Sequence, residues 1–232
     1  MIPLKDDNPT VGRPVVTYLL IGLCVLVFLM ELGSESENIF LSYGLIPSVL
    51  MGHGHPELQK FYVVPAYVTI LTSMFMHGGW IHLFFDMLYI WIFADNIEGD
   101  LGPRNFIIFY LLSGVGAAMA QVLMDTSSQV PMIGASGAIE GVMGAYLINH
   151  SNTRVLVLNP FDFFSQLIKI RALYVLGFWL VIQFIISSMM SLQGVRVAYA
   201  AHIGGFITGM VLILFFNKTT KRKTKIVKGP WS

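Results

Sequence analysis

The chain has 232 residues, of which 55% are hydrophobic and only 12% are charged, and its formal net charge at neutral pH is +1. A mean hydropathy of +0.70 excludes an ordinary soluble globular domain. Its main basic cluster is a short tail with a single aromatic residue, Trp231, which does not favour a nucleic-acid-binding protein. The composition therefore predicts an integral membrane protein, with the lipid bilayer as its surroundings.

Long apolar windows recur along the chain. A helix needs about 20 mostly apolar residues to cross a hydrocarbon layer of ~30 Å. Because we find no internal repeat and no low-complexity linker, we expect an all-α polytopic membrane protein with one domain over residues 1–232 and a basic tail at 217–232. The six predicted helices cover approximately residues 14–32, 80–97, 106–124, 133–148, 173–190 and 197–216.

The first window is predicted to be a retained helix rather than a signal peptide. Its apolar core is long, and no small-residue cleavage site follows it. It contains Cys24, the single cysteine, which has no partner for an internal disulfide. The following segment, Gly33 to Gly79, mixes apolar and polar runs, and we expect it to lie in the membrane interface. The same is expected of the connector from Asn159 to Arg171.

The distribution of basic residues predicts the orientation. With both termini in the cytoplasm, twelve Lys and Arg residues lie inside, and only Lys60 and Arg196 lie outside. Six crossings are an even number, as two cytoplasmic termini require. We therefore expect a multi-pass protein of the cell membrane whose second, fourth and sixth helices enter from the outer side.

Four polar side chains stand near the outer ends of these three helices. They are His82 and Asp86 in the second helix, Ser136 in the fourth and His202 in the sixth. At a rise of ~1.5 Å per residue, all four lie within roughly the outer 10 Å of the membrane. Polar groups in a bilayer are costly and tend to mark function. A serine close to a histidine indicates nucleophilic catalysis.

Small residues predict that the fourth and sixth helices touch. Such residues recur every four positions in both helices, and this spacing allows close backbone packing in lipid. His202 lies three residues before Gly205 and seven before Gly209, so it shares their face. We therefore expect Ser136 and His202 to meet at this contact. The small residues are Gly137, Gly141 and Ala145 in one helix, and Gly205 and Gly209 in the other.

Each of these signals also has a structural interpretation. Gly134-Ala135-Ser136-Gly137 alone is typical of helix packing, and a lone intramembrane histidine often serves as a structural donor. A zinc site is disfavoured, because His77 and His82 are five residues apart and Asp95 falls at the opposite end of the helix. We expect no metal and no soluble cofactor. The remaining histidines, His53, His55 and His150, lie in or at loops and are assigned no function.

Three stretches together resemble one family, the rhomboid intramembrane serine proteases, in the six-helix form common in bacteria and archaea. The stretches are MFMHGGWIHLFFDMLYIWIFADNIEG, GASGAIEGVMGAYL and AHIGGFITGM. The resemblance covers nearly the whole chain, from the opening MIPLKDDNP onward. It includes the order, spacing and sidedness of the three stretches, which makes it far more specific than a serine between glycines.

The resemblance implies a function for the four polar residues. Ser136 would be the nucleophile and His202 its general base, acting as a dyad without a third carboxylate. His82, the backbone N–H of Ser136 and the side chain at position 86 would stabilise the oxyanion, which needs preorganised donors. The implied substrate is a single-span membrane protein cut in or near its transmembrane segment. Small residues and a locally unstable helix would be preferred there.

Asp86 departs from the family pattern, which has an asparagine at this position. An ionised carboxylate has no proton to donate, and the loss of one oxyanion donor can cost about 2.7 to 4 kcal/mol. Three interpretations stay open. The favoured one is a protonated Asp86 that donates as an amide would. Alternatively, an ionised Asp86 stabilises protonated His202 or His82, or the protein is a slow enzyme or a pseudoprotease that binds transmembrane helices without cutting them.

Glu140 is the second departure, because some family members carry an aromatic residue at this position. It lies one turn after Ser136 in a predicted membrane helix. We expect either a proton network with Asp86 and the histidines or a simple position in a water-filled cavity. A transporter that uses His82, Asp86 and Glu140 as a proton relay is a further alternative. The sequence lacks the inverted repeats and discontinuous helices typical of that class.

Overall fold

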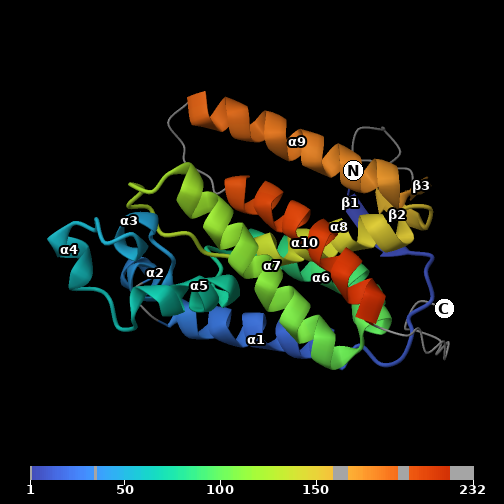
Figure 1. The fold of residues 1–232 in the computed structure, drawn as a ribbon, viewed down its shortest axis with the longest axis horizontal. Coiled ribbons are helices and arrows are strands. Elements are labelled where there is room, and N and C mark those ends of the chain that lie inside the picture. The colour runs from blue at the N-terminus through green and yellow to red at the C-terminus, as the bar shows by residue number, and fades with distance from the viewer. Residues whose placement is uncertain (1, 34–35, 159–166, 193–198, 220–232) are drawn as a thin grey trace.

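The computed structural model describes residues 2–33, 36–158, 167–192 and 199–219. The long helices of these residues form a bundle in which consecutive helices run in alternating directions (Figure 1). The N-terminal ends of α6, α8 and α10 therefore lie at the same end of the bundle. The long helices are α1 (Val15–Leu32), α6 (Trp80–Leu101), α7 (Pro103–Met124), α8 (Ser136–His150), α9 (Ala172–Leu192) and α10 (Tyr199–Thr219).

The predicted fold class is confirmed, since the protein is mainly helical and rich in long apolar helices. Among the described residues, three helices are long and apolar enough to cross a membrane by themselves: Val15–Leu32, Pro103–Met124 and the Tyr199–Lys218 part of α10. Helix α6 meets the same criterion of length and hydropathy when it is taken together with residues Ala66–Phe75. The two segments are bent by 81° relative to each other. The count of six crossings stays a prediction, because α8 is only 15 residues long.

Helix α8 lies in the middle of the bundle, between α6, α7 and α10. Its residues from Ala138 to Tyr146 are all buried, which explains why they are small or apolar apart from Glu140 and Tyr146. Buried aromatic side chains pack around it: the ring of Phe93 contacts that of Tyr146, with centroids 5.0 Å apart. The central helix therefore presents its first residue, Ser136, from a closely packed scaffold.

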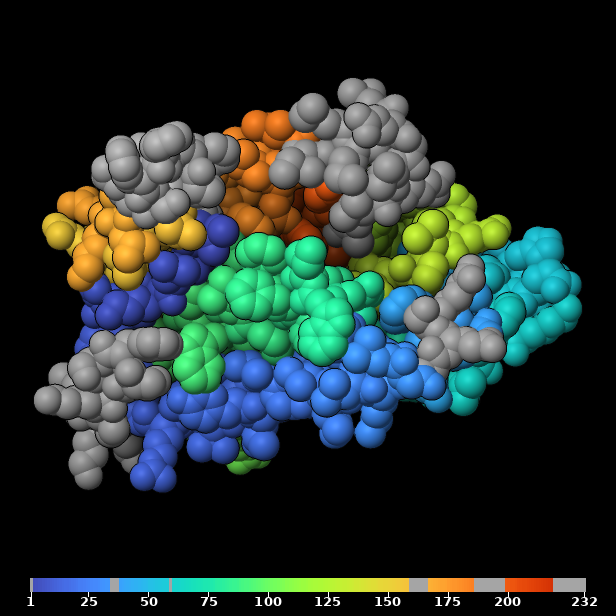
Figure 2. Space-filling view, turned by 180° about the vertical axis from the view of Figure 1, so that it is seen from behind, coloured from blue at the N-terminus to red at the C-terminus, as the bar shows by residue number. Residues whose placement is uncertain are grey.

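Helices α1 and α9 flank the bundle, and α6 is exposed between them on the rear face (Figure 2). The side chains of Trp80, Ile81 and Phe84 are all more than half exposed on this helix. Apolar side chains that face outward fit a lipid environment. The N-terminus of α1 is held by Glu98, whose carboxylate accepts hydrogen bonds from the backbone N–H groups of Val16, at 3.0 Å, and Thr17, at 2.8 Å.

The segment from Ser36 to Gly79 folds into short helical turns at the end of the bundle where α6, α8 and α10 begin (Figure 1). Leu45 and Met132 join it to the chain before α8 through two backbone hydrogen bonds of 3.0 and 2.7 Å. Its position in a membrane interface stays a prediction. The elements are α2 (Ser36–Tyr43), α3 (Pro47–Leu50), α4 (Pro56–Gln59), η1 (Ala66–Val68), α5 (Thr69–Thr72) and η2 (Ser73–Phe75).

A small antiparallel sheet closes the other end of the bundle and was not predicted from the sequence. Its strands are β1 (Ile2–Asp6), β2 (Arg154–Leu158) and β3 (Leu167–Arg171), in the order β1-β2-β3. Val155 and Val157 alternate with more exposed neighbours and are fully buried, as expected for one face of a strand. The expected connector from Asn159 to Arg171 thus ends in a strand. Its residues 159–166, like Arg196 and tail residues 220–232, lie outside the described residues.

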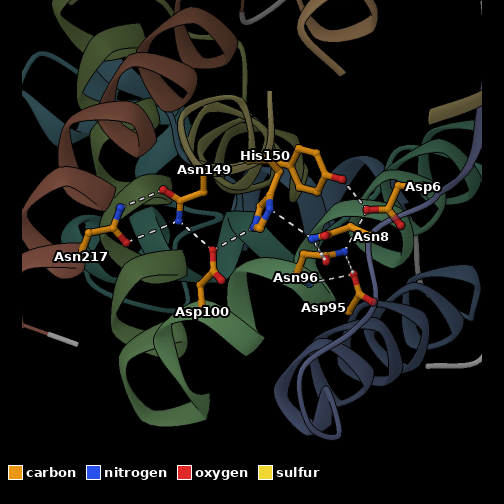
Figure 3. A network of polar contacts seen from close by, with 9 residues as sticks. Asp6, Asn8, Asp95, Asn96, Asp100, Asn149, His150 and Asn217 are labelled. Carbon is orange, nitrogen blue, oxygen red and sulfur yellow. Dashed lines mark hydrogen bonds and ion pairs between the residues drawn. The ribbon is translucent and has the colours of Figure 1, made fainter. Parts of the chain in front are cut away.

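A network of polar side chains ties the same end together (Figure 3). His150 at the end of α8 contacts Asp100 of α6 at 2.9 Å and Asn8 of the N-terminal segment at 3.1 Å. Asp6 accepts hydrogen bonds from Asn96, at 3.0 Å, and from Tyr146. This network fixes the end of the bundle that lies opposite Ser136. It gives His150 the structural environment expected of it.

Candidate active site

Ser136 is the first residue of α8, and the backbone before it explains why. Gly134 has φ +126°, a conformation that side-chain-bearing residues rarely adopt, and α8 begins at Ser136, three residues after the approximate start expected from the sequence. A Cβ at Gly134 would stand 2.8 Å from Nε2 of His82 and 3.5 Å from Oγ of Ser136. A glycine is therefore required for these two side chains to come together.

Ser136 and His202 meet at the contact between α8 and α10, as the sequence predicts. The distance from Ser136 Oγ to His202 Nε2 is 2.9 Å, which is a hydrogen-bond distance. The backbones approach closely, because a Cβ on Gly205 would lie 2.0 Å from the carbonyl oxygen of Gly137. The small residues thus bring the two helices close enough for a short serine side chain to reach the imidazole.

His82 points its Nε2 toward the same place. Its Nδ1 accepts a hydrogen bond of 3.4 Å from the backbone N–H of Gly78, so the proton of a neutral ring resides on Nε2. That nitrogen is next to Gly134 and close to Ser136. The arrangement offers an N–H donor beside the serine, as oxyanion stabilisation requires.

Asp86 lies one turn after His82 and is nearly buried. Its Oδ2 is 3.6 Å from Nε2 of His82 and 3.3 Å from Nε2 of His77. His77 is almost fully buried, with an exposed fraction of 1%. Five residues separate the two histidines, yet both rings reach the same carboxylate because His77 precedes the helix and is not bound to helical spacing. Within the described part of the chain, no group of three or more such side chains is suited to hold a metal ion.

Glu140 is buried within α8 and connects to α9. Its Oε1 accepts hydrogen bonds from Trp179, at 2.8 Å, and from the side-chain amide of Gln183. The carbonyl oxygen of Gln183 in turn contacts Nδ1 of His202. Glu140 is therefore linked to His202 through Gln183, which the sequence reasoning missed, while a shared proton network that includes Asp86 stays a prediction. A side-chain amide within a mainly apolar helix was the signal that could have identified it.

A cavity of about 580 Å³ lies beside Ser136 and His202. A water molecule takes up about 30 Å³ in the liquid, so this space accommodates a peptide segment as well as water. Its lining is mostly apolar, with a few converging polar groups, as is typical of binding sites. The polar lining residues include His82, Asp86, Ser136, Glu140 and His202.

A serine in contact with a histidine, an N–H donor and a cavity inside a bundle of apolar helices are features of a membrane protein with a hydrolase-like site. The sequence pattern of the Rhomboid domain family matches residues 65–219, a range that includes all four predicted site residues. This match covers more than half of the chain. The protein belongs to the rhomboid family.

Several curated proteins of this family are similar to the chain. Rhomboid protease GluP of Bacillus subtilis is 27% identical over 201 residues, which cover 85% of this chain and 34% of that protein. Rhomboid-like protein 11, chloroplastic, of Arabidopsis thaliana is 29% identical over 83% of this chain and 64% of its own length. Rhomboid protease GlpG of Haemophilus influenzae is 25% identical over 89% of this chain and 93% of its own length. The chain thus spans only part of the first two relatives but almost all of the third.

Proposed function

We propose that this protein is an intramembrane serine protease that cleaves peptide bonds in or near transmembrane segments of membrane proteins. The observation that carries the proposal is the 2.9 Å contact between Ser136 Oγ and His202 Nε2 at the wall of the cavity. A serine hydroxyl is a weak nucleophile until an adjacent base removes its proton. Family relatives named as rhomboid proteases support the same activity.

The proposed reaction begins when His202 takes the hydroxyl proton and Ser136 Oγ attacks the carbonyl carbon of the scissile peptide. The tetrahedral oxyanion accepts hydrogen bonds from Nε2–H of His82 and from the backbone N–H of Ser136, which lacks an intrahelical partner at the first position of α8. The helix dipole also favours negative charge there. Protonated His202 then donates its proton to the leaving amine, and an acyl-enzyme on Ser136 remains.

Water completes the cycle in the second half of the reaction. His202 accepts a proton from the water as it attacks the ester carbonyl, and the same donors stabilise the second oxyanion. The ester bond breaks, the proton returns to Ser136 Oγ, and the carboxylate product leaves. The reaction needs no cofactor, since proton transfer and charge stabilisation come from the protein.

Asp86 has a proposed role that depends on its two histidine neighbours. We propose that Asp86, His77 and His82 share a proton, so that no uncompensated negative charge faces the oxyanion. A neutral carboxylic acid would donate a hydrogen bond as an amide does. An ionised carboxylate beside a protonated imidazole would keep His82 in place as the donor. In both protonation states, the site holds a proton that can be donated in a hydrogen bond to the oxyanion. An isolated carboxylate has no such proton.

The proposed substrate is a single-span membrane protein whose helix unwinds easily. A peptide bond inside a helix is shielded by its hydrogen bonds, so small residues and a locally unstable helix expose it to Ser136. The test is cleavage of such a protein reconstituted with the full chain in lipid vesicles. Cleavage by the parent and its loss in Ser136→Ala support the proposal. Mass spectrometry of the fragments then maps the cut to the membrane segment.

The alternative function is that of a pseudoprotease, and the carboxylate at position 86 is the observation that favours it. Such a protein binds transmembrane helices and leaves them intact. Co-purification of the intact substrate with both the parent and Ser136→Ala, without fragments from either, would favour this alternative. Restored cleavage in Asp86→Asn would identify position 86 as the cause.

The proposed location is a cell membrane, with both termini in the cytoplasm and the cavity toward the outer side. The basic side chains support this orientation through their uneven distribution. The test uses a Cys24→Ser background, which removes the single thiol, with one new cysteine at a time. In intact cells, Lys60→Cys is expected to react with a membrane-impermeant maleimide and Arg154→Cys is not. The reverse pattern would contradict the orientation.

A further inference from the structure

A chain of side-chain contacts leads from His202, on the side away from Ser136, into α9. Nδ1 of His202 contacts Oε1 of Gln183, and Nε2 of Gln183 donates to Oε1 of Glu140. The indole N–H of Trp179 donates to the same carboxylate oxygen at 2.8 Å. We call Gln183, Glu140 and Trp179 the amide relay. Its members come from α8 and α9, whereas His202 belongs to α10.

The direction of each hydrogen bond follows from two groups: the indole of Trp179 can only donate, and the ionised carboxylate of Glu140 can only accept. Because Trp179 donates to Oε1 of Glu140, that oxygen is an acceptor, and the amide nitrogen of Gln183 supplies its second donor. The carbonyl oxygen of Gln183 is then the atom that faces His202. A carbonyl oxygen only accepts, so the ring proton of neutral His202 is on Nδ1.

This proton position decides whether His202 can act as a base. With the proton on Nδ1, the lone pair of Nε2 faces Ser136 Oγ at 2.9 Å. In the other tautomer, Nε2 would carry the proton and could not accept one. Serine proteases with a triad use a buried carboxylate to select the tautomer, and the wrong tautomer costs about 10⁴-fold in turnover.

The relay is buried, which makes its orientation specific. Gln183 is 7% exposed and Glu140 is 3% exposed, so water competes little for their hydrogen bonds. A free amide could turn by 180° and present its NH₂ group to His202. Glu140 prevents this, because the turned amide would place its carbonyl oxygen against a carboxylate oxygen. Glu140 therefore controls His202 through Gln183, without touching it.

We propose that Gln183 is a positioning residue that holds His202 in the tautomer required of a general base, and that Glu140 locks the Gln183 amide in the matching orientation. This inference rests on the proposed function, in which His202 is that base. It replaces the expected two-residue dyad by a dyad with an amide and a carboxylate behind it. In a catalytic triad, the third residue orients the histidine. Here Gln183 orients His202, and Glu140 orients Gln183.

The first measurement is the tautomer itself, read from the nitrogen shifts of ¹⁵N-histidine in the purified full chain. The chain has six histidines, and the signal lost in His202→Asn identifies the relevant ring. We expect Nδ1–H in the parent and a mixture of both tautomers in Gln183→Leu. An Nε2–H ring in the parent, or an unchanged ring in Gln183→Leu, would overturn the proposal. This reading needs no enzymatic activity, so it stays informative if the proposed function fails.

The second measurement is the rate at which a fluorophosphonate probe labels Ser136. Gln183→Leu is expected to lower this rate about 10-fold to 100-fold, as other losses of a partner behind a functional histidine do. Val181→Leu, a change on the exposed side of the same helix, is the matched control and is expected to label at the parental rate. Equal rates for Gln183→Leu and Val181→Leu would overturn the proposal.

The exchanged pair Glu140→Gln/Gln183→Glu separates positioning from a merely structural role. It keeps a carboxylate as acceptor for Nδ1–H of His202 and an amide donor toward that carboxylate, whereas Trp179, which shares one oxygen of Glu140 with Gln183 in the parent, loses that acceptor. We expect it to label within a few-fold of the parent and to retain the Nδ1–H tautomer, while Glu140→Leu does neither. If the exchanged pair folds like the parent but loses the tautomer, the relay does not work as proposed. An unlabelled parent with the expected tautomers would instead reject the proposed function alone.

Discussion

The carbonyl oxygen of Gly141 occupies the place where a side chain on Gly209 would have to stand. A Cβ on Gly209 would lie 1.9 Å from that oxygen, far inside contact distance. The neighbouring pair, Gly137 and Gly205, shows the same relationship one turn closer to Ser136. The separation of α8 and α10, and with it the distance between Ser136 and His202, is thus set by glycines.

Gly209→Ala is therefore expected to push α8 and α10 apart. The obstacle is backbone, which cannot rotate away, so the free energy of unfolding should fall by about 1–3 kcal/mol or more, as in overpacked cores. Thermal unfolding in detergent measures this loss. Gly177→Ala in α9 is the control, since nothing lies within 4 Å of its added methyl group. A Gly209→Ala protein as stable as the control would contradict the glycine contact.

Asp6 predicts a pH dependence of stability. Burial is the main cause that raises the pKa of this carboxyl from 3.8 to about 7. The folded protein therefore binds a proton that the unfolded chain releases between these two values, and stability is lost as the pH rises through this window. Asp6→Asn keeps an acceptor for Tyr146 and should remove this dependence. Thermal unfolding at a series of pH values measures it.

Asp7→Asn is the matched control for this measurement. Asp7 pairs with Lys169 at 2.9 Å in a partly exposed position, so its replacement should leave the slope of stability against pH unchanged. If Asp6→Asn shows the same slope as the parent, the carboxyl of Asp6 is not the group that titrates.

Asp86→Asn is expected to keep the protein active and to widen the pH range of its activity. The amide carries its own N–H donors at every pH, whereas the parent depends on the proton that Asp86 shares with His77 and His82. The rate of fluorophosphonate labelling across the pH range of folded protein gives the comparison. Asp95→Asn, at the other end of α6, should follow the parental profile. If the parent is labelled more slowly than Asp86→Asn by the same factor at every pH, the result contradicts a shared proton.

The positions of the main helices and the meeting of Ser136 with His202 were predictable, because both follow from apolar length and small-residue spacing. The sheet was missed for a physical reason: its strands are short, and Ile2–Asp6 pairs with Arg154–Leu158 from a distant part of the chain. The start of α8 was placed too early, because the backbone angle of Gly134 is a property of the folded turn.

Gln183 shows where sequence reasoning ended at the candidate site. Its amide is one polar group in an apolar helix, and its partners Glu140 and His202 are 43 and 19 residues away. No local spacing relates them, so only the packing of α8, α9 and α10 brings them together. His77 was considered only as a metal ligand, because helical periodicity does not predict a ring that enters the site from the segment before the helix.

The most direct test of the account is covalent labelling of the purified full chain by a fluorophosphonate probe, followed by mass spectrometry of the modified peptide. The predicted result is a single adduct on Ser136 that is absent from Ser136→Ala and strongly slowed in His202→Asn. Thermal unfolding of each variant confirms that it is folded. Well-folded parent protein that takes up no probe, or takes it up equally in Ser136→Ala, would contradict a nucleophilic serine activated by His202.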